Sequence, residues 1–291
     1  MKKFIKLLTT LCLAAVICIP AFTLTACNKP DPNDPNTILI GASVTPHAEI
    51  LKDVVKAELK KQGYNLVVYE YTDYITPNTA VESGDLNANY FQHIKYMNEF
   101  NEENGTHLVS VAEVHYEAFG IYRGGKYSSG ELADLPDGAK VLVPNDTTNE
   151  ARALFLLQQA GLITLKENVN PMTATKTDIE SNPKNLDITE VEAAQTAISL
   201  PDTAISIING NYALGAGLSY DDALVLEEQS AAVAQYVNVI AVKEGHENEA
   251  KIVALAKAIK TAAVKQYILQ KYDGGVVPVF EVEELLDEID A

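Results

Sequence analysis

Hydrophobic and polar positions along this chain form two alternating patterns. Short apolar runs bounded by polar residues predict buried strands, and they lie at residues 38–40, 66–69, 108–114, 140–143, 186–191, 203–208 and 238–242. Apolar residues three and four positions apart predict helices at 49–61, 149–159 and 247–272, and a terminal helix or frayed end at 281–290. Strands that alternate with helices are typical of an α/β protein with mainly parallel sheets.

The first 36 residues have a different pattern. Three lysines within the first six residues precede an apolar run that Pro20 interrupts, and this run is too short to span a bilayer. It is typical of an export signal, and the next residues, Leu24-Thr25-Ala26-Cys27, resemble a bacterial lipobox. We therefore expect a signal peptide over 1–26, a lipid on Cys27 and a proline-rich tether over 27–36. A plain secretory signal is the alternative.

Charge and cysteine content narrow the function of the body. The formal net charge of −18 argues against binding to nucleic acid or directly to anionic lipid. The only cysteines besides Cys27 are Cys12 and Cys18, which lie in the expected signal. This distribution excludes a disulfide, a cysteine metal site and a cysteine nucleophile.

Neither the spacing of the histidines nor any known motif in the chain indicates a metal site or a catalytic site. No pair among His47, His107, His115 and His246 shows metal spacing with acidic residues, so we expect neither a metal nor a cofactor. The chain has no Gly-x-Ser-x-Gly elbow and no glycine-rich phosphate loop. An enzyme is therefore the less favoured alternative to a binding protein.

The segment after the strand at 140–143 predicts a site for a carboxylate. Thr147, with Glu150 three residues later, fits a capping box and predicts a helix with Thr147 as its N-cap. Asn149 and Arg152 are then neighbours on the first turns. Free backbone N–H groups, the helix dipole and a guanidinium would converge on one point. The alternative is an ordinary capped helix with a solvated arginine.

Three further segments offer candidate contacts. Phe91 and His93 would share one strand face, where an aromatic wall beside an imidazole suits an apolar side chain next to a polar head group. A core phenylalanine with a surface histidine is the alternative. A turn could present Tyr74 at the sheet edge, and Asn209 follows an apolar strand, the usual place for ligand contacts in open α/β sheets.

Together these segments resemble the methionine-binding lipoprotein family, which supplies methionine to ABC importers. The resemblance extends from about residue 38 to residue 280. It is carried by Asp73-Tyr74, Pro77-Asn78, Gly84-Asp85, Asn87-Ala88-Asn89, Phe91-Gln92-His93, Val143-Pro144-Asn145-Asp146, Asn149, Arg152, Asn182-Pro183-Lys184-Asn185-Leu186, Ile208-Asn209 and Tyr212-Ala213.

The resemblance implies a two-lobed fold of the periplasmic-binding-protein type (type II) with a ligand cleft between the lobes. Residues 37–118 and 211–291 would form one lobe, and residues 119–210 the other. The protein would be lipid-anchored on the extracytoplasmic side of the cell membrane, would have no enzymatic activity, and would deliver methionine to an ABC importer permease. A binder of another small amino acid or peptide and a surface adhesin are the alternatives.

The same resemblance assigns roles to individual residues. Arg152 would pair with the ligand carboxylate, and Asn149 and Asn209 would hydrogen-bond the zwitterion, whose buried charges each need a partner. Aromatic contacts stabilise a thioether, so the side-chain pocket would be formed by Tyr74, Phe91 and His93. Further cleft candidates are Asn145, Tyr116 and His115. His115 is one because it has same-face strand spacing with Glu117, and a structural hydrogen bond is the alternative for it.

The chain also departs from the family's pattern. Thr147 stands where the family often has proline, and Glu117-Ala118 replaces a typical Glu-Pro. The residues after Gln195 also differ from those of many members. These departures leave three ligand forms open: L-methionine, D-methionine or a methionine-containing dipeptide.

Overall fold

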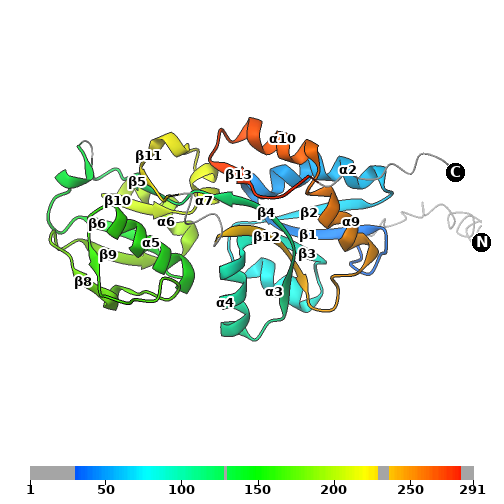
Figure 1. The fold of residues 1–291 in the computed structure, drawn as a ribbon, viewed down its shortest axis with the longest axis horizontal. Coiled ribbons are helices and arrows are strands. Elements are labelled where there is room, and N and C mark those ends of the chain that lie inside the picture. Colours follow the sequence, from blue (N-terminus) through cyan, green and yellow to red (C-terminus); the bar gives the residue numbers. More distant parts are fainter. Residues whose placement is uncertain (1–29, 128–129, 229–235, 283–291) are drawn as a thin grey trace, which may run out of the picture. The chain divides into compact units, whose positions relative to one another are not determined.

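The computed structural model describes residues 30–127, 130–228 and 236–282 (Figure 1). The expected signal peptide, the lipidation site Cys27 and residues 283–290 of the expected terminal helix lie outside these ranges. In the part of the chain that is described, no helix has the length and apolar character needed to cross a membrane.

The first and last strands of the described chain belong to one six-stranded sheet. Its strand order is β13-β4-β12-β3-β1-β2. The strands are β1 (Thr37–Ser43), β2 (Asn65–Tyr71), β3 (Ala88–His93), β4 (Leu108–Glu117), β12 (Val237–Lys243) and β13 (Val276–Pro278). β1 pairs in parallel with β2 and β3, whereas the pairs of β12 with β3 and β4, and of β13 with β4, are antiparallel.

Both faces of this sheet are covered by helices. Successive residues of a strand point to opposite faces, and both faces carry apolar side chains that need covering. Ile38 and Ile40 of β1 belong to one hydrophobic cluster and Leu39 to another. The first cluster includes residues of the helical stretch formed by η1 (Val44–Ala48), η2 (Leu51–Val55) and α2 (Lys56–Lys61), and of α9 (Ala250–Ala258) and α10 (Ala262–Lys271). The second includes residues of α3 (Thr76–Ser83) and α4 (Ile94–Asn104).

A five-stranded sheet has its own hydrophobic core. Its order is β11-β5-β10-β6-β9. The strands are β5 (Gly120–Arg123), β6 (Lys140–Pro144), β9 (Asp187–Val191), β10 (Ile205–Ile208) and β11 (Ala223–Leu226). α5 (Thr147–Gln159) packs on one face through residues such as Leu154 and Leu157. α6 (Ala193–Ile198) and α7 (Gly210–Gly215) contribute to a cluster with Tyr122 and Ile208 on the other.

The remaining described elements are short. β7 (Thr164–Leu165) and β8 (Ile179–Ser181) form a two-stranded ladder. Single 3₁₀ turns are η3 (Leu132–Asp134), η4 (Lys176–Asp178), η5 (Leu200–Asp202) and η6 (Tyr220–Asp222).

The chain passes between the two sheets at residues 118–119, which join β4 to β5, and again between β11 and β12. The expected lobe boundaries stay a prediction, but one strand departs from them. β11 pairs with β5 in the five-stranded sheet, although residues 211–291 were assigned to the lobe of the other sheet. β11 lies downstream of the expected boundary between residues 210 and 211. Its apolar residues nevertheless pack on the core of the five-stranded sheet.

The predicted strands and the first two predicted helices are present, with three corrections. The sheets are mixed rather than mainly parallel, because β5, β11, β12 and β13 run antiparallel to the strands they pair with. The expected helix at 247–272 is two helices, since Thr261 adopts an extended conformation (φ −75°, ψ 158°) and begins α10. The helices α3 and α4 were not predicted.

The third correction concerns the expected tether. Its last described residues are held on the body by Lys251 of α9, whose Nζ donates to the carbonyl oxygens of Pro32 (2.6 Å) and Asp34 (3.2 Å). Asn87 donates to the same carbonyl of Pro32 (2.9 Å). The chain is therefore anchored before β1 begins.

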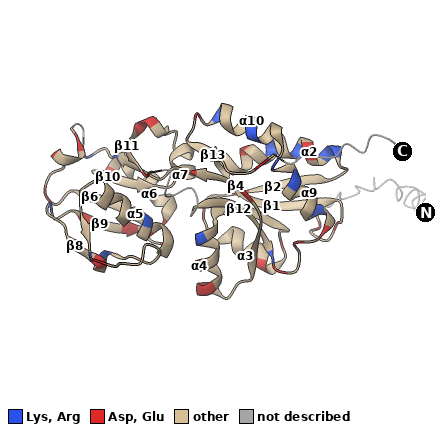
Figure 2. Cartoon of the chain, viewed as in Figure 1, with Lys and Arg blue, Asp and Glu red and all other residues tan. Residues whose placement is uncertain are grey.

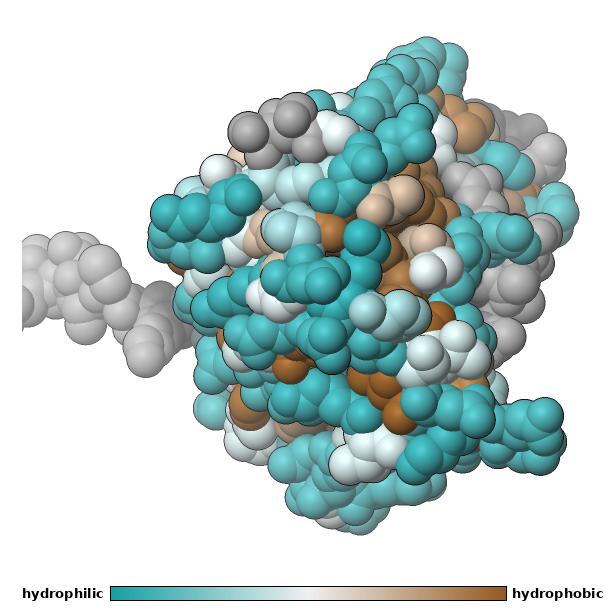
Figure 3. Space-filling model, turned by 90° about the vertical axis from the view of Figure 1, so that its left-hand side faces the viewer, coloured by the Kyte–Doolittle hydropathy of each residue, from teal (hydrophilic) through white to brown (hydrophobic). Residues whose placement is uncertain are grey.

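Charged residues lie mainly on the outer helices, such as α2 and α10, while the strands carry few (Figure 2). On the face drawn in Figure 3, hydrophilic residues surround several small apolar areas. This surface is therefore mainly polar, as the strong net charge implies.

Candidate ligand-binding site

Elements from both sheets meet at one pocket. It is lined by Tyr74, Phe91, Gln92, His93, Tyr96, Glu117, Asn149, Arg152, Asn209, Gly210, Asn211 and Asn238. All six residues that the sequence predicts as ligand contacts are among them, though their role stays a prediction. The cavity volume is about 20 Å³, which is room for about one water, since roughly 10–15 Å³ holds one, and far too little for an amino acid. A ligand therefore enters only when these side chains separate.

One wall of the pocket is aromatic. The ring of Tyr74 lies 5.5 Å from those of Phe91 and Tyr96 and 5.0 Å from that of Tyr212. Tyr74 precedes α3, Phe91 lies on β3 and Tyr96 on α4, so the six-stranded sheet and its helices supply most of this wall. The Tyr74 hydroxyl donates to Asn211 Oδ1 (2.6 Å), which joins the wall to α7.

The first turn of α5 forms the opposite side, with a different cap from the one predicted. Asp146, not Thr147, is the N-cap: its Oδ1 accepts from the backbone N–H (3.1 Å) and Nδ2 (2.8 Å) of Asn149. The Thr147 hydroxyl instead donates to Glu103 on α4 (2.7 Å). Burial raises the pKa of Asp146 to about 6, so its carboxylate is ionised at pH 7 and accepts these bonds.

Asn149 joins residues from both sheets. Its Oδ1 lies 3.1 Å from Nε2 of His93 and accepts from Nδ2 of Asn209 (3.0 Å). Nδ1 of His93 accepts from the backbone N–H of Tyr96 (3.0 Å), so the neutral ring carries its proton on Nε2. Burial, with the charge of Arg152, lowers the pKa of His93 to about 3. The carbonyl oxygen Oδ1 of Asn209 is buried with no hydrogen-bond partner in the described structure.

Arg152 is buried and held by an internal carboxylate. Its Nε donates to Oε2 of Glu227 (2.9 Å), its Nη2 to Oε1 of the same residue, and Nη2 also to the backbone oxygen of Glu117 (3.1 Å). The guanidinium lies 4.1 Å from the ring of Tyr236 and 4.7 Å from that of Phe119. Burial acts to lower the pKa of Arg152, but the Glu227 carboxylate outweighs it and raises that pKa above its usual value.

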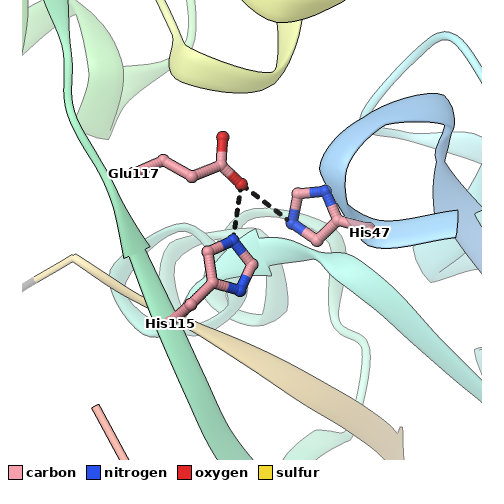
Figure 4. Close-up of side chains that lie close together, drawn as sticks. All are labelled: His47, His115 and Glu117. Atoms are coloured by element: carbon pink, nitrogen blue, oxygen red, sulfur yellow. Dashed lines mark hydrogen bonds and ion pairs between the residues drawn. The ribbon is translucent and has the colours of Figure 1, made fainter. Parts of the chain in front are cut away.

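A second buried carboxylate reaches the pocket from β4. Oε1 of Glu117 lies 2.7 Å from Nε2 of His115 and 3.2 Å from Nε2 of His47 (Figure 4). Burial raises the pKa of Glu117, while the His47 and Arg152 charges oppose that shift. The same-face spacing of His115 and Glu117 indicated His115 as the cleft residue, but Glu117 is the one that reaches the pocket.

The other predicted cleft residues do not line the pocket. Asn145 is exposed beyond the end of β6. His115 is fully buried and reaches the pocket only through Glu117. The Tyr116 hydroxyl donates to Oε1 of Glu227 (2.6 Å), behind Arg152. Sequence reasoning did not identify Tyr96, Asn238 or Glu227, because each comes from a segment without a distinctive motif. It also did not identify Asn211, although this residue lies only two positions after Asn209.

A larger cavity of about 430 Å³ lies elsewhere, between the expected tether, the start of β3 and α9. Its lining includes Pro35, Leu86, His246 and Lys251 and none of the predicted ligand contacts. Cavity volume is therefore a poor guide to the candidate site in this protein. The candidate site is chosen because buried charged groups and aromatic rings converge there.

Comparisons with known proteins show the family of this chain. The model of the NlpA lipoprotein family matches residues 38–280. The chain is 40% identical over 275 residues to the methionine-binding lipoprotein MetQ of Bacillus subtilis, covering 92% of this chain and 98% of that protein. It is 38% identical to the membrane lipoprotein TpN32 of Treponema pallidum, covering 83% of this chain and 87% of that protein.

Solved structures show the same fold. A lipoprotein from Ruminococcus gnavus has a TM-score of 0.80 at 53% identity, covering 84% of this chain and all of that one. A nutrient-binding protein from Burkholderia cenocepacia bound to methionine has a TM-score of 0.78 at 39% identity, with 84% and 100% coverage. The predicted two-lobed α/β fold class is thereby confirmed.

Proposed function

Because this chain belongs to the NlpA lipoprotein family, we propose that it captures methionine outside the cell membrane and delivers it to an ABC importer. The ligand is L-methionine, D-methionine or a methionine-containing dipeptide. The anchor is a lipid on Cys27, and the partner is the permease of the importer. The names of the relatives support this role: one is a methionine-binding lipoprotein and another is the substrate-binding protein of a methionine transporter.

The observation that carries the proposal is the convergence of complementary polar groups on one buried pocket. A zwitterion loses its hydration on entry, so each of its charges needs a partner there. Arg152 and the Asn149 amide face the carboxylate, whereas the unpartnered Oδ1 of Asn209 and the carboxylate of Glu117 accept from the ammonium. Glu117 thus joins the residues that the sequence predicted.

The aromatic wall completes the recognition of the ligand. Tyr74, Phe91 and Tyr96 surround the apolar side chain, and a thioether sulfur gains roughly 0.3–1.5 kcal/mol from each such ring. His93 is neutral and already bonded to Asn149 and Tyr96, so it orients the head-group site without acting as a general base. The protein is a binding module without turnover.

Thermal unfolding of the full chain, purified in detergent and refolded to remove bound ligand, tests the proposal. A ligand at 100 times its dissociation constant adds about 2.7 kcal/mol of stability, which raises the midpoint by roughly 5 °C for a chain of this size. We expect that shift with a methionine compound and not with the Asn209→Ala variant.

The same experiment separates the alternatives. A shift with another amino acid or peptide, and none with L-methionine, D-methionine or Gly-Met, would retain the transport role and remove methionine. Chromatography of the ligand after incubation with the protein tests for turnover. Conversion of the bound compound into a product would favour an enzyme instead.

A further inference from the structure

Three side chains that can bind a metal meet in the interior beside the pocket. His47 comes from η1, and His115 and Glu117 come from β4 (Figure 4). Both imidazoles point their Nε2 atoms at Oε1 of Glu117, and the three ligand atoms lie within 4.8 Å of one another. Both histidines are fully buried and Glu117 is nearly so. We propose that these residues bind a divalent transition-metal ion, and that Zn²⁺ fits them best.

The donor set supports this choice of ion. Two imidazole nitrogens and one carboxylate oxygen are a common zinc-binding set that leaves a fourth position open, with Zn–N distances of about 2.0–2.1 Å and Zn–O distances of about 2.0–2.2 Å. Nε2 of His115 and Nε2 of His47 now lie 2.7 Å and 3.2 Å from the carboxylate oxygen. An ion fits between them when the flexible Glu117 side chain withdraws slightly. Ca²⁺ and Mg²⁺ prefer oxygen ligands and fit poorly.

Neighbouring groups orient one of the two imidazoles, that of His115, as a metal site requires. A ligating histidine is usually held at its other ring nitrogen by a hydrogen-bonding partner. Nδ1 of His115 is held by the hydroxyl of Tyr90, which is buried on β3. Oδ1 of Asn238 lies 3.0 Å from Nε2 of His47, and this oxygen could serve as the fourth ligand of the ion. Nδ1 of His47 has no hydrogen-bond partner in the described structure, and this ring is held by packing against those of Tyr90 and His115.

The surroundings also permit a cation to enter and stay. Glu117 and Asn238 line the ligand pocket, so an ion reaches the cluster by the same opening. The guanidinium of Arg152 is paired with the carboxylate of Glu227 and reaches Glu117 only at its backbone oxygen, so the Glu117 carboxylate stays available to an ion. The net charge of −18 raises the local concentration of cations around the protein. Without an ion, His115 hydrogen-bonds to Glu117 and Nε2 of His47 lies close to the same carboxylate oxygen, which keeps the site preformed.

This site goes beyond the proposed function and does not depend on it. If methionine binds as proposed, the ion and the ligand ammonium both engage Glu117, and each weakens the binding of the other. Metal binding itself is measured without methionine, so a failure of either proposal is recognised separately.

The experiment is equilibrium dialysis of the ligand-free full chain against Zn²⁺, followed by elemental analysis. We expect one ion per chain. His115→Gln and His47→Gln should each weaken binding by more than about 100-fold, because losing a ligand costs at least as much as losing an outer-shell partner. The matched control is a double variant, His107→Gln with His246→Gln, which removes the two surface histidines that lie beside Glu82 and Glu249. It should bind as the unaltered chain does.

Two results would overturn the proposal. One is the absence of a bound ion in the unaltered chain, which would leave the cluster as a structural hydrogen-bond network. The other is binding that the surface double variant loses, which would mark an adventitious surface ion. Should the buried variants fail to fold, Co²⁺ replaces Zn²⁺ as the probe: visible absorption typical of four-coordinate Co²⁺ that persists in the surface double variant supports the cluster, and its disappearance there refutes it.

Discussion

Two buried cations in this protein have opposite surroundings. Lys251 of α9 is 5% exposed, and all three of its hydrogen bonds go to backbone carbonyls, those of Pro32, Asp34 and Thr37. Arg152 of α5 is 6% exposed, but it is paired with the carboxylate of Glu227 and faces a pocket. The ammonium is a compact point charge with three donors, all used locally, whereas the planar guanidinium has five.

This difference teaches that burial of a cation does not by itself indicate a ligand site. The Lys251 region is also next to the larger cavity, yet its polar groups satisfy one another. The Arg152 region contains an acceptor without a partner, Oδ1 of Asn209, and a buried carboxylate, that of Glu117. We therefore expect the first region to contribute to stability and the second to binding.

The largest expected effect is on Arg152. Arg152→Ala should weaken methionine binding by about 3–5 kcal/mol, because a buried ligand carboxylate would then lack its partner. Isothermal titration calorimetry measures it. The control is Arg123→Ala on β5, whose Nη2 donates to the backbone oxygen of Gly130 and which should bind normally. Unchanged affinity in Arg152→Ala would remove this residue from the site.

Lys251 provides the contrasting variant. Lys251→Met should destabilise the fold by about 1–3 kcal/mol, because the carbonyl oxygens of Pro32 and Asp34 lose their buried donor. Methionine affinity should stay as it was. Urea denaturation and calorimetry on the same sample test both parts, and a large loss of affinity with no loss of stability would reverse the comparison.

Acid should destabilise the pocket region. Burial holds the folded pKa of His93 at about 3, below its usual 6.5, so protonation favours the unfolded chain. Its stabilising contribution is complete above about pH 6.5 and falls as the pH drops towards 3, by about 2 kcal/mol between pH 6.5 and 5. The groups facing His93 are Arg152, Asn149, Lys95, Tyr96 and Tyr236.

The unfolding free energy of His93→Gln should fall less steeply with acid than that of the unaltered chain. Urea titrations at several pH values measure the two slopes. His47 and His115 titrate in both proteins, so only the difference in slope is informative. Equal slopes would mean that His93 is not held neutral in the fold.

The smallest expected effect is on the cap of α5. Asp146→Ala removes the acceptor for the Asn149 N–H groups and should destabilise the fold by about 0.5–2 kcal/mol. Thr147→Val should cost less, because Thr147 does not cap the helix. Thermal unfolding of the two variants compares them, and a greater loss in Thr147→Val would restore the cap predicted from the sequence.

Local patterns in the sequence determined the strands, the long helix α5 and the proximity of Asn149 to Arg152. These features depend on residues close together in the chain, where hydrophobic periodicity and helical spacing apply directly. The family resemblance assigned roles to the six predicted contacts, and all six line one pocket.

Only the tertiary structure decided which distant groups complete each local feature. Both Asp146 and Thr147 can cap a helix, and the choice followed from the bond of Thr147 to Glu103 on α4. The partner of Arg152, Glu227, lies 75 residues away, and His47 meets Glu117 from another segment. Such pairs depend on the order and direction of strands in the two sheets, which neither periodicity nor spacing along the chain encodes.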